Sequence, residues 1–373
     1  MIKIDIKEKL TSIITLLSIP GVGSGRYHKL IKKFSSIENI FTASVNQLEE
    51  VPGISHALAK TIKNNRDESK AKEIAAKIIQ LGWNIHFHKE PSFPKQFYSI
   101  TGREIPPLLF SIGKEIKPDD KLIAIVGSRH ATEKGKQFAY QLAQSLVSSN
   151  IIVVSGMAEG IDSAAHKGTI DSSGHTVAIW GASLDKVYPP SNKTLAEQIA
   201  QTGTVFSEYL PDTPPDRAHF PQRNRLIAGL SDGIVVVEAG QKSGALITAN
   251  LAVTYEKELF AVPGAPAAKL SLGTNQLIKN GAKLLTSVDD IFDELPRLKC
   301  NIRVRQFKQM TDLTEIERKL VKLFSEGPQQ VDKISRTVNL SVPELMEFLL
   351  ALELKGIVKE LSGKRFILSE EYI

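Results

Sequence analysis

Between residues 121 and 293, this sequence alternates short apolar runs with longer segments of helical pattern. Many of the runs are rich in β-branched residues, and near-continuous apolar strands between helices are typical of a parallel sheet covered on both faces. We therefore predict an α/β fold with an extended, Rossmann-like, doubly wound and mostly parallel sheet. Ligands of such sheets bind beyond the carboxyl ends of the strands. The expected strands are 122–126, 151–154, 176–179, 204–206, 234–237 and 259–262.

The first 88 residues contain short helical patterns and two turns of one form. Ile-Pro-Gly-Val-Gly at 19–23 and Val-Pro-Gly-Ile-Ser at 51–55 each follow one expected helix and precede another. This pattern resembles a pair of helix-hairpin-helix units, a SAM-like arrangement whose turns bind a nucleic-acid phosphate through backbone N–H groups. A helical protein-interaction module, in which glycine only makes tight turns, fits the same residues. We predict a helical domain at 1–88 and leave both roles open.

The Rossmann-like domain is expected at 89–296. It begins with a proline-rich connector at 89–120, which we expect to contain one edge strand at 108–111. Residues 297–310 carry several cations and are interpreted as a linker.

Residues 311–373 are expected to form a winged-helix domain. That fold often binds DNA through its third helix. Here the third helix is acidic and apolar, so we favour a protein-interaction role. The expected helices are 315–324, 330–337 and 342–355, and the expected strands, joined by a Ser-Gly-Lys turn, are 357–361 and 365–368.

The charge and cysteine content narrow the class of protein. The 373 residues carry a formal net charge of +6, which favours a polyanionic partner. Cys300 is the only cysteine, which excludes an intrachain disulfide and suits a reducing compartment. No segment reaches transmembrane length, and Asp5 and Glu8 stand where a signal peptide would be basic. We expect a cytoplasmic protein with no membrane association.

Cations and glycines gather between residues 220 and 249. Two arginines open a helical segment, a buried strand follows, and a Gly/Ser loop with a lysine begins the next helix. Cations and free backbone N–H groups at a sheet edge suit anion binding. On a helix the two arginines would point to different faces, whereas at a loop-to-helix junction both could face one groove. The candidate residues are Arg223, Asn224, Arg225, Lys242, Ser243 and Gly244.

The loops after the first two strands are expected to lie at the same edge of the sheet and to contribute further candidate residues. Asp162 is expected to cap the helix that follows the second strand. Asp162 and His166 are four residues apart on one helix face, a spacing that could bind a metal, but no third ligand is evident. We therefore favour a capping role for Asp162 and a hydrogen-bonded role for His166. We predict no metal and no cofactor. The candidate ligand-binding residues of these loops are Gly127, Ser128, Arg129, Gly156 and Lys167, although Lys167 could equally be a solvated surface lysine.

Three other side chains near the strand ends have expected roles. Glu208 and Glu238 each end a strand, and we expect each to pair with one of the two arginines, Arg223 or Arg225. Tyr188 could stack on a nucleobase or pack against the neighbouring prolines.

These segments, in their order and spacing, resemble the DNA-processing protein family of bacterial transformation, known as DprA or Smf. Helical N-terminal and winged-helix C-terminal segments also fit that family. The matching motifs are GSR at 127–129, SGMAEGIDSAAHKG at 155–168, YPPSN at 188–192, SEY at 207–209, FPQRNRLIAGLS at 220–231, EAGQKSGALITA at 238–249 and VPG at 262–264.

The resemblance implies a non-enzymatic protein that binds single-stranded DNA in a basic pocket, protects incoming strands and loads the RecA recombinase during natural transformation. It also implies a homodimer formed by the Rossmann-like domain. Glu159 departs from the family, which usually has Arg or Lys there; its carboxylate would repel phosphate or pair with Arg129 or Lys167. The basic motif positions carried over are Arg129, Lys167, Arg223 and Arg225, with Gly127, Ser128, Gly156 and Gly244 shaping the loops.

An alternative hypothesis is a nucleotide-binding or nucleotide-hydrolysing enzyme related to the Rossmann-like phosphoribohydrolases. The PGGxGTxxE loop of that family is missing, and EAGQKSGALITA stands in the corresponding region. Hydrolysis needs a positioned general acid and general base, and the sequence shows no such pair. A third hypothesis, a pure protein-interaction scaffold, leaves the cations at the sheet edge unexplained.

Overall fold

The computed structural model describes residues 2–100, 104–299, 313–324, 329–338, 340–354, 357–361 and 364–368. They belong to two compact units, residues 1–299 and 300–373. The expectations for Cys300, for most of the linker at 297–310 and for most of the Ser-Gly-Lys turn lie outside the described residues.

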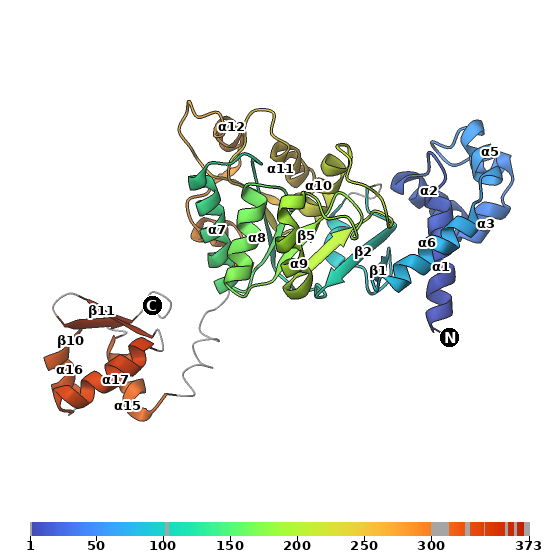
Figure 1. Ribbon diagram of the computed structural model, residues 1–373. Helices are drawn as coiled ribbons and strands as arrows, with labels where there is room; N and C mark the ends of the chain where they lie inside the picture. The colour runs from blue at the N-terminus through green and yellow to red at the C-terminus, as the bar shows by residue number, and fades with distance from the viewer. Residues whose placement is uncertain are drawn as a thin grey trace. The chain divides into compact units, whose positions relative to one another are not determined.

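The described strands of the first unit form one nine-stranded sheet in the order β1-β2-β6-β5-β4-β3-β7-β8-β9 (Figure 1). Pairing is parallel from β6 to β9, and antiparallel where β2 meets β1 and β6. The expected mostly parallel, Rossmann-like sheet is therefore confirmed. The strands are β1 (Asn84–Phe87), β2 (Leu108–Gly113), β3 (Leu122–Val126), β4 (Ile152–Ser155), β5 (Thr176–Ile179), β6 (Thr204–Ser207), β7 (Gly233–Val236), β8 (Glu258–Ala261) and β9 (Lys283–Leu284).

Three strands of this sheet differ from expectation, and one of them, β9, was not expected at all. β1 lies in a segment expected to be helical, and β2 is not an edge strand, because β1 pairs along its outer side. Leu108 and Phe110 pack in one hydrophobic cluster and Leu109 in another, so both faces of β2 are covered. The prolines around β2 suggested an edge, but they flank this buried strand and do not interrupt it.

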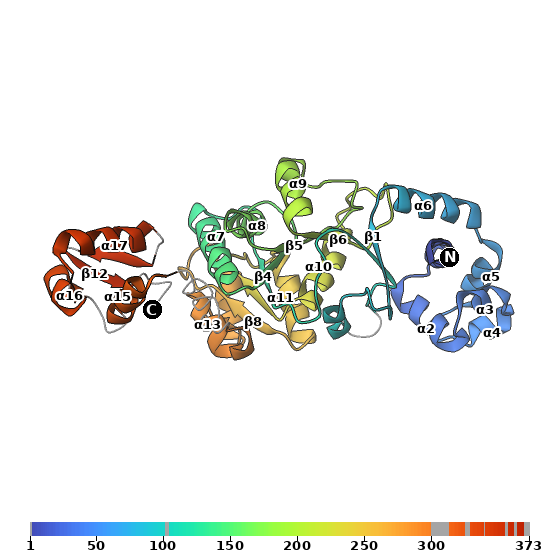
Figure 2. The same ribbon diagram turned by 90° about the horizontal axis from the view of Figure 1, so that it is seen from below.

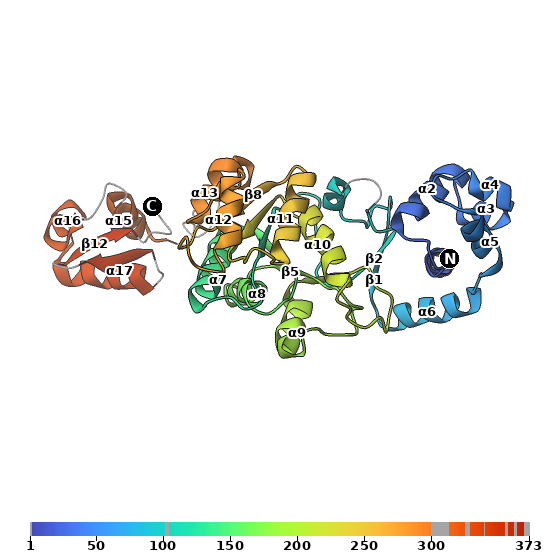
Figure 3. The same ribbon diagram turned by 90° about the horizontal axis from the view of Figure 1, so that it is seen from above.

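Helices cover both faces of the sheet, as its alternating side chains require. Ile123 and Val235 pack with α7 and α8, while Ala124 and Val236 pack with α10 and α11. In Figures 2 and 3, α7, α8 and α9 lie on one side of the sheet and α10 and α11 on the other. The helices of this domain are α7 (Glu133–Ser148), α8 (Ile161–Asp171), α9 (Lys193–Thr202), α10 (His219–Leu230), α11 (Ala245–Thr254), α12 (Leu272–Lys279) and α13 (Val288–Glu294), with 3₁₀ turns η1 (Lys95–Ser99), η2 (Pro190–Asn192) and η3 (Pro296–Leu298).

The N-terminal helices form the expected pair of hairpins. Gly21 and Gly53 adopt φ values of 91° and 92°, which a side chain would disfavour. Ser55 occupies the place of Gly23, and its hydroxyl accepts a hydrogen bond from the N–H of Leu58, so the second turn keeps its form. The helices are α1 (Ile2–Leu17), α2 (Ser24–Phe34), α3 (Ile37–Thr42), α4 (Val45–Glu49), α5 (His56–Asn64) and α6 (Glu68–Gln80).

The second unit has the expected winged-helix form. Leu320, Ile334, Leu349 and Phe366 are buried together in its core. Throughout the part of the chain that the structure describes, helices are too short or too polar to cross a membrane. The elements of this unit are α15 (Glu315–Phe324), β10 (Gln329–Gln330), α16 (Val331–Val338), α17 (Val342–Leu354), β11 (Val358–Leu361) and β12 (Arg365–Leu368).

Candidate functional site

A cavity of about 510 Å³ opens where β3, β4 and β7 end and α10 and α11 begin. Its volume lies in the range of pockets that hold a small ligand. Gly156 lines a smaller cavity beside it, and Arg129 and Arg223 line both. The sequence-based candidates that the larger cavity brings together are Gly127, Arg129, Arg223, Asn224, Ser243 and Gly244.

Arg223 is almost completely buried, with 4% of its surface exposed. Its Nη1 group donates to the carbonyl of Gly156 at 2.6 Å and also to the carbonyl of Ile179. Burial lowers the pKa of Arg223 to about 10, although the nearby carboxylate of Asp162 opposes that shift. Arg223 therefore links α10 to the ends of β4 and β5 and forms part of the cavity wall.

Asp162 does not cap α8 as expected, since the cap position is Gly160 and Asp162 lies inside the first turn. Its Oδ2 atom accepts hydrogen bonds from the N–H groups of Gly156 at 3.1 Å and Ala158 at 3.2 Å. Burial raises the pKa of Asp162, and the charge of Arg223 opposes the rise. The carboxylate thus uses N–H groups of this loop that an external anion would otherwise bind.

Arg225 points away from Arg223, because both lie within α10 and not at a loop-to-helix junction. Its Nη2 atom pairs with Glu208 at 2.5 Å, and the two side chains are only 12% and 16% exposed. The expected pairing of Glu208 with an arginine is confirmed. The same expectation for Glu238 is wrong, since Glu238 accepts hydrogen bonds from the N–H and hydroxyl of Thr132 at 2.8 and 2.6 Å.

His166 is a buried, hydrogen-bonded residue, as we expected. Its Nδ1 atom lies 2.7 Å from the Thr176 hydroxyl, which itself donates to the carbonyl of Val153. The hydroxyl can therefore only accept from His166, so Nδ1 carries the proton of a neutral ring. Burial and the charge of Arg223 lower the pKa of His166 to about 3. The described residues contain no group of three or more His, Cys, Asp or Glu side chains placed to hold a metal.

The other candidates lie around the cavity but do not line it. Ser128 is buried, and its hydroxyl accepts from the N–H of His130. Lys242 is exposed on the loop before α11. Lys167 is exposed in a separate groove of about 800 Å³ between α7 and α8.

Comparison with known proteins assigns the family. Protein Smf of Synechocystis sp. is 30% identical over an alignment of 383 positions that covers 93% of this chain and 96% of that protein. The family model described as DNA recombination-mediator protein A matches residues 84–296, more than half of the chain. The chain belongs to the DprA/Smf family. Flanking regions of this DprA-family chain match a SAM-like helix-hairpin-helix tandem at 13–65 and the DprA winged helix domain at 309–364.

Other DprA proteins are similar in sequence or structure. DNA processing protein DprA of Bacillus subtilis is 40% identical over 241 residues, covering 64% of this chain and 80% of that protein. The X-ray structure of DprA from Streptococcus pneumoniae superposes with a TM-score of 0.66 at 31% identity, covering 76% and 97% of the two chains. A structure described as giving the single-stranded DNA binding mode of the Helicobacter pylori protein has a TM-score of 0.52 at 31% identity, covering 58% and 96%.

Glu159, which we expected to depart from the family's motif, lies between the smaller cavity and the α7–α8 groove. It lines both the smaller cavity and the α7–α8 groove that contains Lys167. The expected pairing with Arg129 or Lys167 is wrong, since the Glu159 Oε1 atom accepts a hydrogen bond of 2.6 Å from the hydroxyl of Ser191. An exposed carboxylate therefore separates the two cationic regions of this DprA-family chain.

The lining residues that the sequence reasoning missed include Arg217 and Phe220. Arg217 is exposed, and Phe220 contacts the guanidinium of Arg129, with the Cζ atom 5.2 Å from the ring centroid. Both precede the arginine pair in the DRAHFPQRNR stretch. The alternation of basic and aromatic residues in this stretch is the sequence signal that could have identified these two lining residues.

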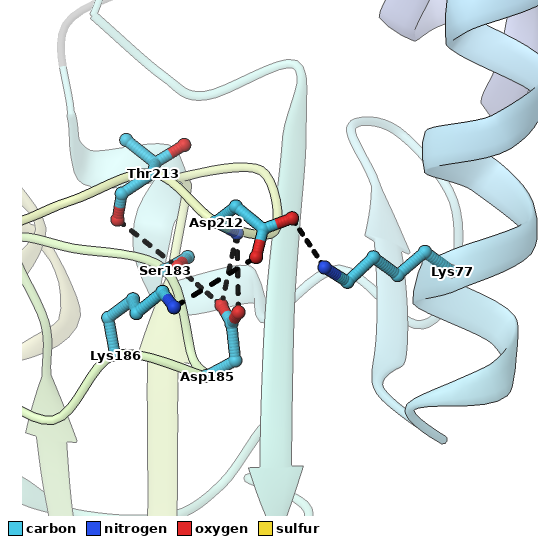
Figure 4. Close-up of polar contacts among 6 residues, drawn as sticks. All are labelled: Lys77, Ser183, Asp185, Lys186, Asp212 and Thr213. Atoms are coloured by element: carbon cyan, nitrogen blue, oxygen red, sulfur yellow. Dashed lines mark hydrogen bonds and ion pairs between the residues drawn. The ribbon is translucent and has the colours of Figure 1, made fainter.

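The loops after β5 and β6 make polar contacts with each other and with Lys77 of α6 (Figure 4). Lys77 of α6 pairs with Asp212, and the N–H of Asp212 donates to both carboxylate oxygens of Asp185 at 3.3 Å. The N–H of Ser183 donates to the carbonyl of Thr213, which joins the loops after β5 and β6. These loops continue to the cavity residues Tyr188 and Arg217, so α6 supports one side of the site.

Proposed function

We propose that this chain binds single-stranded DNA along the cavity at the strand ends. The observation that carries the proposal is that two exposed arginines, Arg129 and Arg217, line one cavity with the aromatic side chains of Tyr188 and Phe220. Exposed cations neutralise phosphates, and aromatic rings accept bases without regard to sequence. The single-stranded DNA binding described for the Helicobacter pylori relative supports the same ligand.

The candidate residues have different roles in this proposal. Arg129, Arg217 and Lys242 are exposed and contact phosphates, while the buried Arg223 holds the cavity wall. Lys167 extends the path of the strand into the α7–α8 groove. Arg225 supports α10 through Glu208. The remaining candidates shape the loops or the start of α11: Gly127, Ser128, Gly156, Asn224, Ser243 and Gly244.

In its cellular role, the protein protects incoming single strands and passes them to the RecA recombinase during natural transformation. We further propose that it acts in the cytoplasm as a homodimer formed by the Rossmann-like domain, and that it binds DNA without chemical conversion. Support for these proposals comes from the membership of the DprA/Smf family and from a site rich in exposed cations.

Fluorescence anisotropy of the full chain tests the proposal with a labelled single strand and its matched duplex, at about 50 mM and about 200 mM salt. We expect the single strand to bind more tightly, with affinity that falls steeply as salt rises. Chromatography of the same mixtures, and of parallel mixtures with nucleoside monophosphates, checks for released base or ribose. Salt-insensitive or undetectable DNA binding, or release of base or ribose, would overturn the proposal.

A further inference from the structure

A cavity of about 400 Å³, here called the β1–β2 cavity, opens beside β1 and β2. In the order of the sheet, β6 and β5 separate β2 from β4, the nearest strand whose end borders the strand-end cavity (Figure 1). Among the described residues, the two cavities share no lining side chain. The β1–β2 cavity is therefore a site separate from the one proposed to bind DNA.

A serine and a histidine form a hydrogen-bonded pair in the wall of this cavity. Nε2 of His86, on β1, lies 2.8 Å from Oγ of Ser111, on β2, and both residues are buried. Nδ1 of His86 lies 2.6 Å from the carbonyl oxygen of Ser92, which can only accept a hydrogen bond. Nδ1 therefore carries the proton of the neutral ring, and the lone pair of Nε2 accepts the hydroxyl proton of Ser111.

The surroundings of His86 keep its ring neutral and fix its orientation. Burial lowers the pKa of His86 below its ordinary value, although the Ser92 carbonyl and the charge of Glu115 oppose the shift. The ring also contacts Phe206, with centroids 5.7 Å apart and planes inclined by 60°. At about pH 7, His86 is thus an unprotonated base in contact with a hydroxyl group. A nucleophile, a base and a group that orients the base are the parts from which serine hydrolases are built.

Asn84 supplies a hydrogen-bond donor on the same face of the sheet. It lies directly opposite Ser111 in the antiparallel β1–β2 ladder. Side chains of directly opposed residues project from the same face, with Cβ atoms about 4.5–5.5 Å apart. Asn84 and Ser111 both line the cavity. An amide N–H beside an attacking hydroxyl stabilises the oxyanion that forms when an ester carbonyl is attacked.

The rest of the lining indicates what kind of ester fits. Lys114 and Glu115 are exposed, and their opposite charges give the cavity no preference for an ion. The volume lies near the lower end of the range for small-ligand pockets, which restricts the substrate to short chains. Apolar lining residues suit an uncharged acyl group, and these are Ile85, Pro94, Ile116 and Phe206.

We propose that Ser111, His86 and Asn84 form an esterase site that hydrolyses short, uncharged carboxylic esters. Oγ of Ser111 bonds to the ester carbonyl carbon while Nε2 of His86 takes the hydroxyl proton, and the carbonyl oxygen becomes an oxyanion beside Asn84. The bond from the carbonyl carbon to the alcohol oxygen then breaks, and His86 gives its proton to the departing alcohol. Water, deprotonated by His86, attacks the acyl group on Ser111, which releases the carboxylic acid and restores the serine.

A fluorophosphonate probe tests the site on the full chain without any variant. The probe bonds covalently to an activated serine with loss of fluoride, and mass spectrometry of proteolytic peptides identifies the serine that is modified. We expect modification of Ser111 in the folded protein and not in protein unfolded by heat beforehand. Absence of modified Ser111, or equal modification of many serines, would overturn the proposal.

Release of p-nitrophenol from p-nitrophenyl acetate measures the reaction itself. Ser111→Ala should abolish release above the rate in buffer, and His86→Gln should lower kcat/KM between about 100-fold and about 10,000-fold, the usual effect of losing a general base. Asn84→Ala should lower kcat between about 100-fold and about 1,000-fold with little change in KM, because the oxyanion exists only beyond the bound ester. Ser148→Ala, at an exposed serine on α7, is the matched control and should keep full activity.

Circular dichroism and thermal melting establish that each variant is folded, and probe labelling of the unchanged protein decides the question if a variant does not fold. If the unchanged protein releases no p-nitrophenol above the rate in buffer, the esterase site is overturned. Equal release by folded Ser111→Ala and the unchanged protein would reduce Ser111 and His86 to a structural hydrogen bond. Single-strand binding should be the same in all of these folded proteins, so failure of the esterase site leaves the proposed DNA binding standing.

Discussion

The Nη1 atom of Arg223 donates a 2.6 Å hydrogen bond to the carbonyl of Gly156, in the loop that follows β4. The approach is close, because a Cβ atom at Gly156 would lie 2.7 Å from Nη2 of Arg223. The same guanidinium also binds the carbonyl of Ile179 at the end of β5. One residue of the arginine pair therefore joins three elements around the cavity.

Arg223→Ala should lower the stability of the first unit. The variant leaves two buried carbonyls without their donor and the carboxylate of Asp162 without its nearby cation. An unsatisfied buried acceptor costs about 1–3 kcal/mol, so the loss of both hydrogen bonds should cost about 2–6 kcal/mol. Urea unfolding measures the loss, with the exposed Arg217→Ala as the matched control that should change stability little. A variant Arg223→Ala as stable as Arg217→Ala would show that Arg223 has no structural role.

Arg225→Ala should lower stability and leave DNA binding nearly unchanged. Arg225 and Glu208 form a mostly buried ion pair outside the lining of the cavity. Loss of a charged hydrogen bond costs about 1.5–3 kcal/mol. Glu208→Gln should show a similar loss, and the double variant should cost less than the sum of the two. A strong loss of single-strand affinity in a folded Arg225→Ala variant would place Arg225 in the DNA contact instead.

Strands β3 to β8 and the winged helix could be predicted from sequence because apolar runs of strand length are a local signal. The pairing of Glu208 with an arginine followed from opposite charges that both come near strand ends. The burial of Arg223 could not be predicted, since it depends on how α10 packs across the ends of β4 and β5. Likewise, nothing local distinguishes Glu238, which binds Thr132, from Glu208.

Glu159→Gln should strengthen the binding of single strands. Glu159 lines both the smaller cavity, which adjoins the strand-end cavity, and the groove of Lys167, so a strand that passes from one to the other meets a like charge. Removing one exposed charge should raise affinity roughly 2- to 5-fold at low salt, and the gain should fade as salt rises. Glu197→Gln, an exposed carboxylate on α9, is the matched control. If both variants gain equally, the effect belongs to net charge and not to the position of Glu159.

His166 should make the first unit less stable in mild acid. Its pKa is lowered to about 3 in the folded state, whereas an unfolded histidine has a pKa of about 6.5. Between these values the unfolded chain binds the extra proton, so stability falls as pH falls below about 6.5. From pH 7 to pH 5, this one residue should account for a loss of about 2 kcal/mol.

Urea unfolding of the unchanged protein and of His166→Gln, each at about pH 7 and about pH 5, isolates this contribution. The other buried histidines contribute equally to both proteins and cancel. The drop in unfolding free energy should therefore be smaller in His166→Gln by about 2 kcal/mol. Identical pH dependence in the two proteins would mean that His166 is not the residue responsible.

The salt dependence of single-strand affinity tests the central claim most directly, that exposed arginines of the strand-end cavity neutralise DNA phosphates. Each phosphate contact to a single strand contributes about 0.7 to the slope of log affinity against log salt. A double variant with Arg129→Ala and Arg217→Ala should therefore bind more weakly and lose about 1.4 of that slope. Lys279→Ala, an exposed lysine on α12, should keep the full slope. An unchanged slope in a folded double variant would contradict the account.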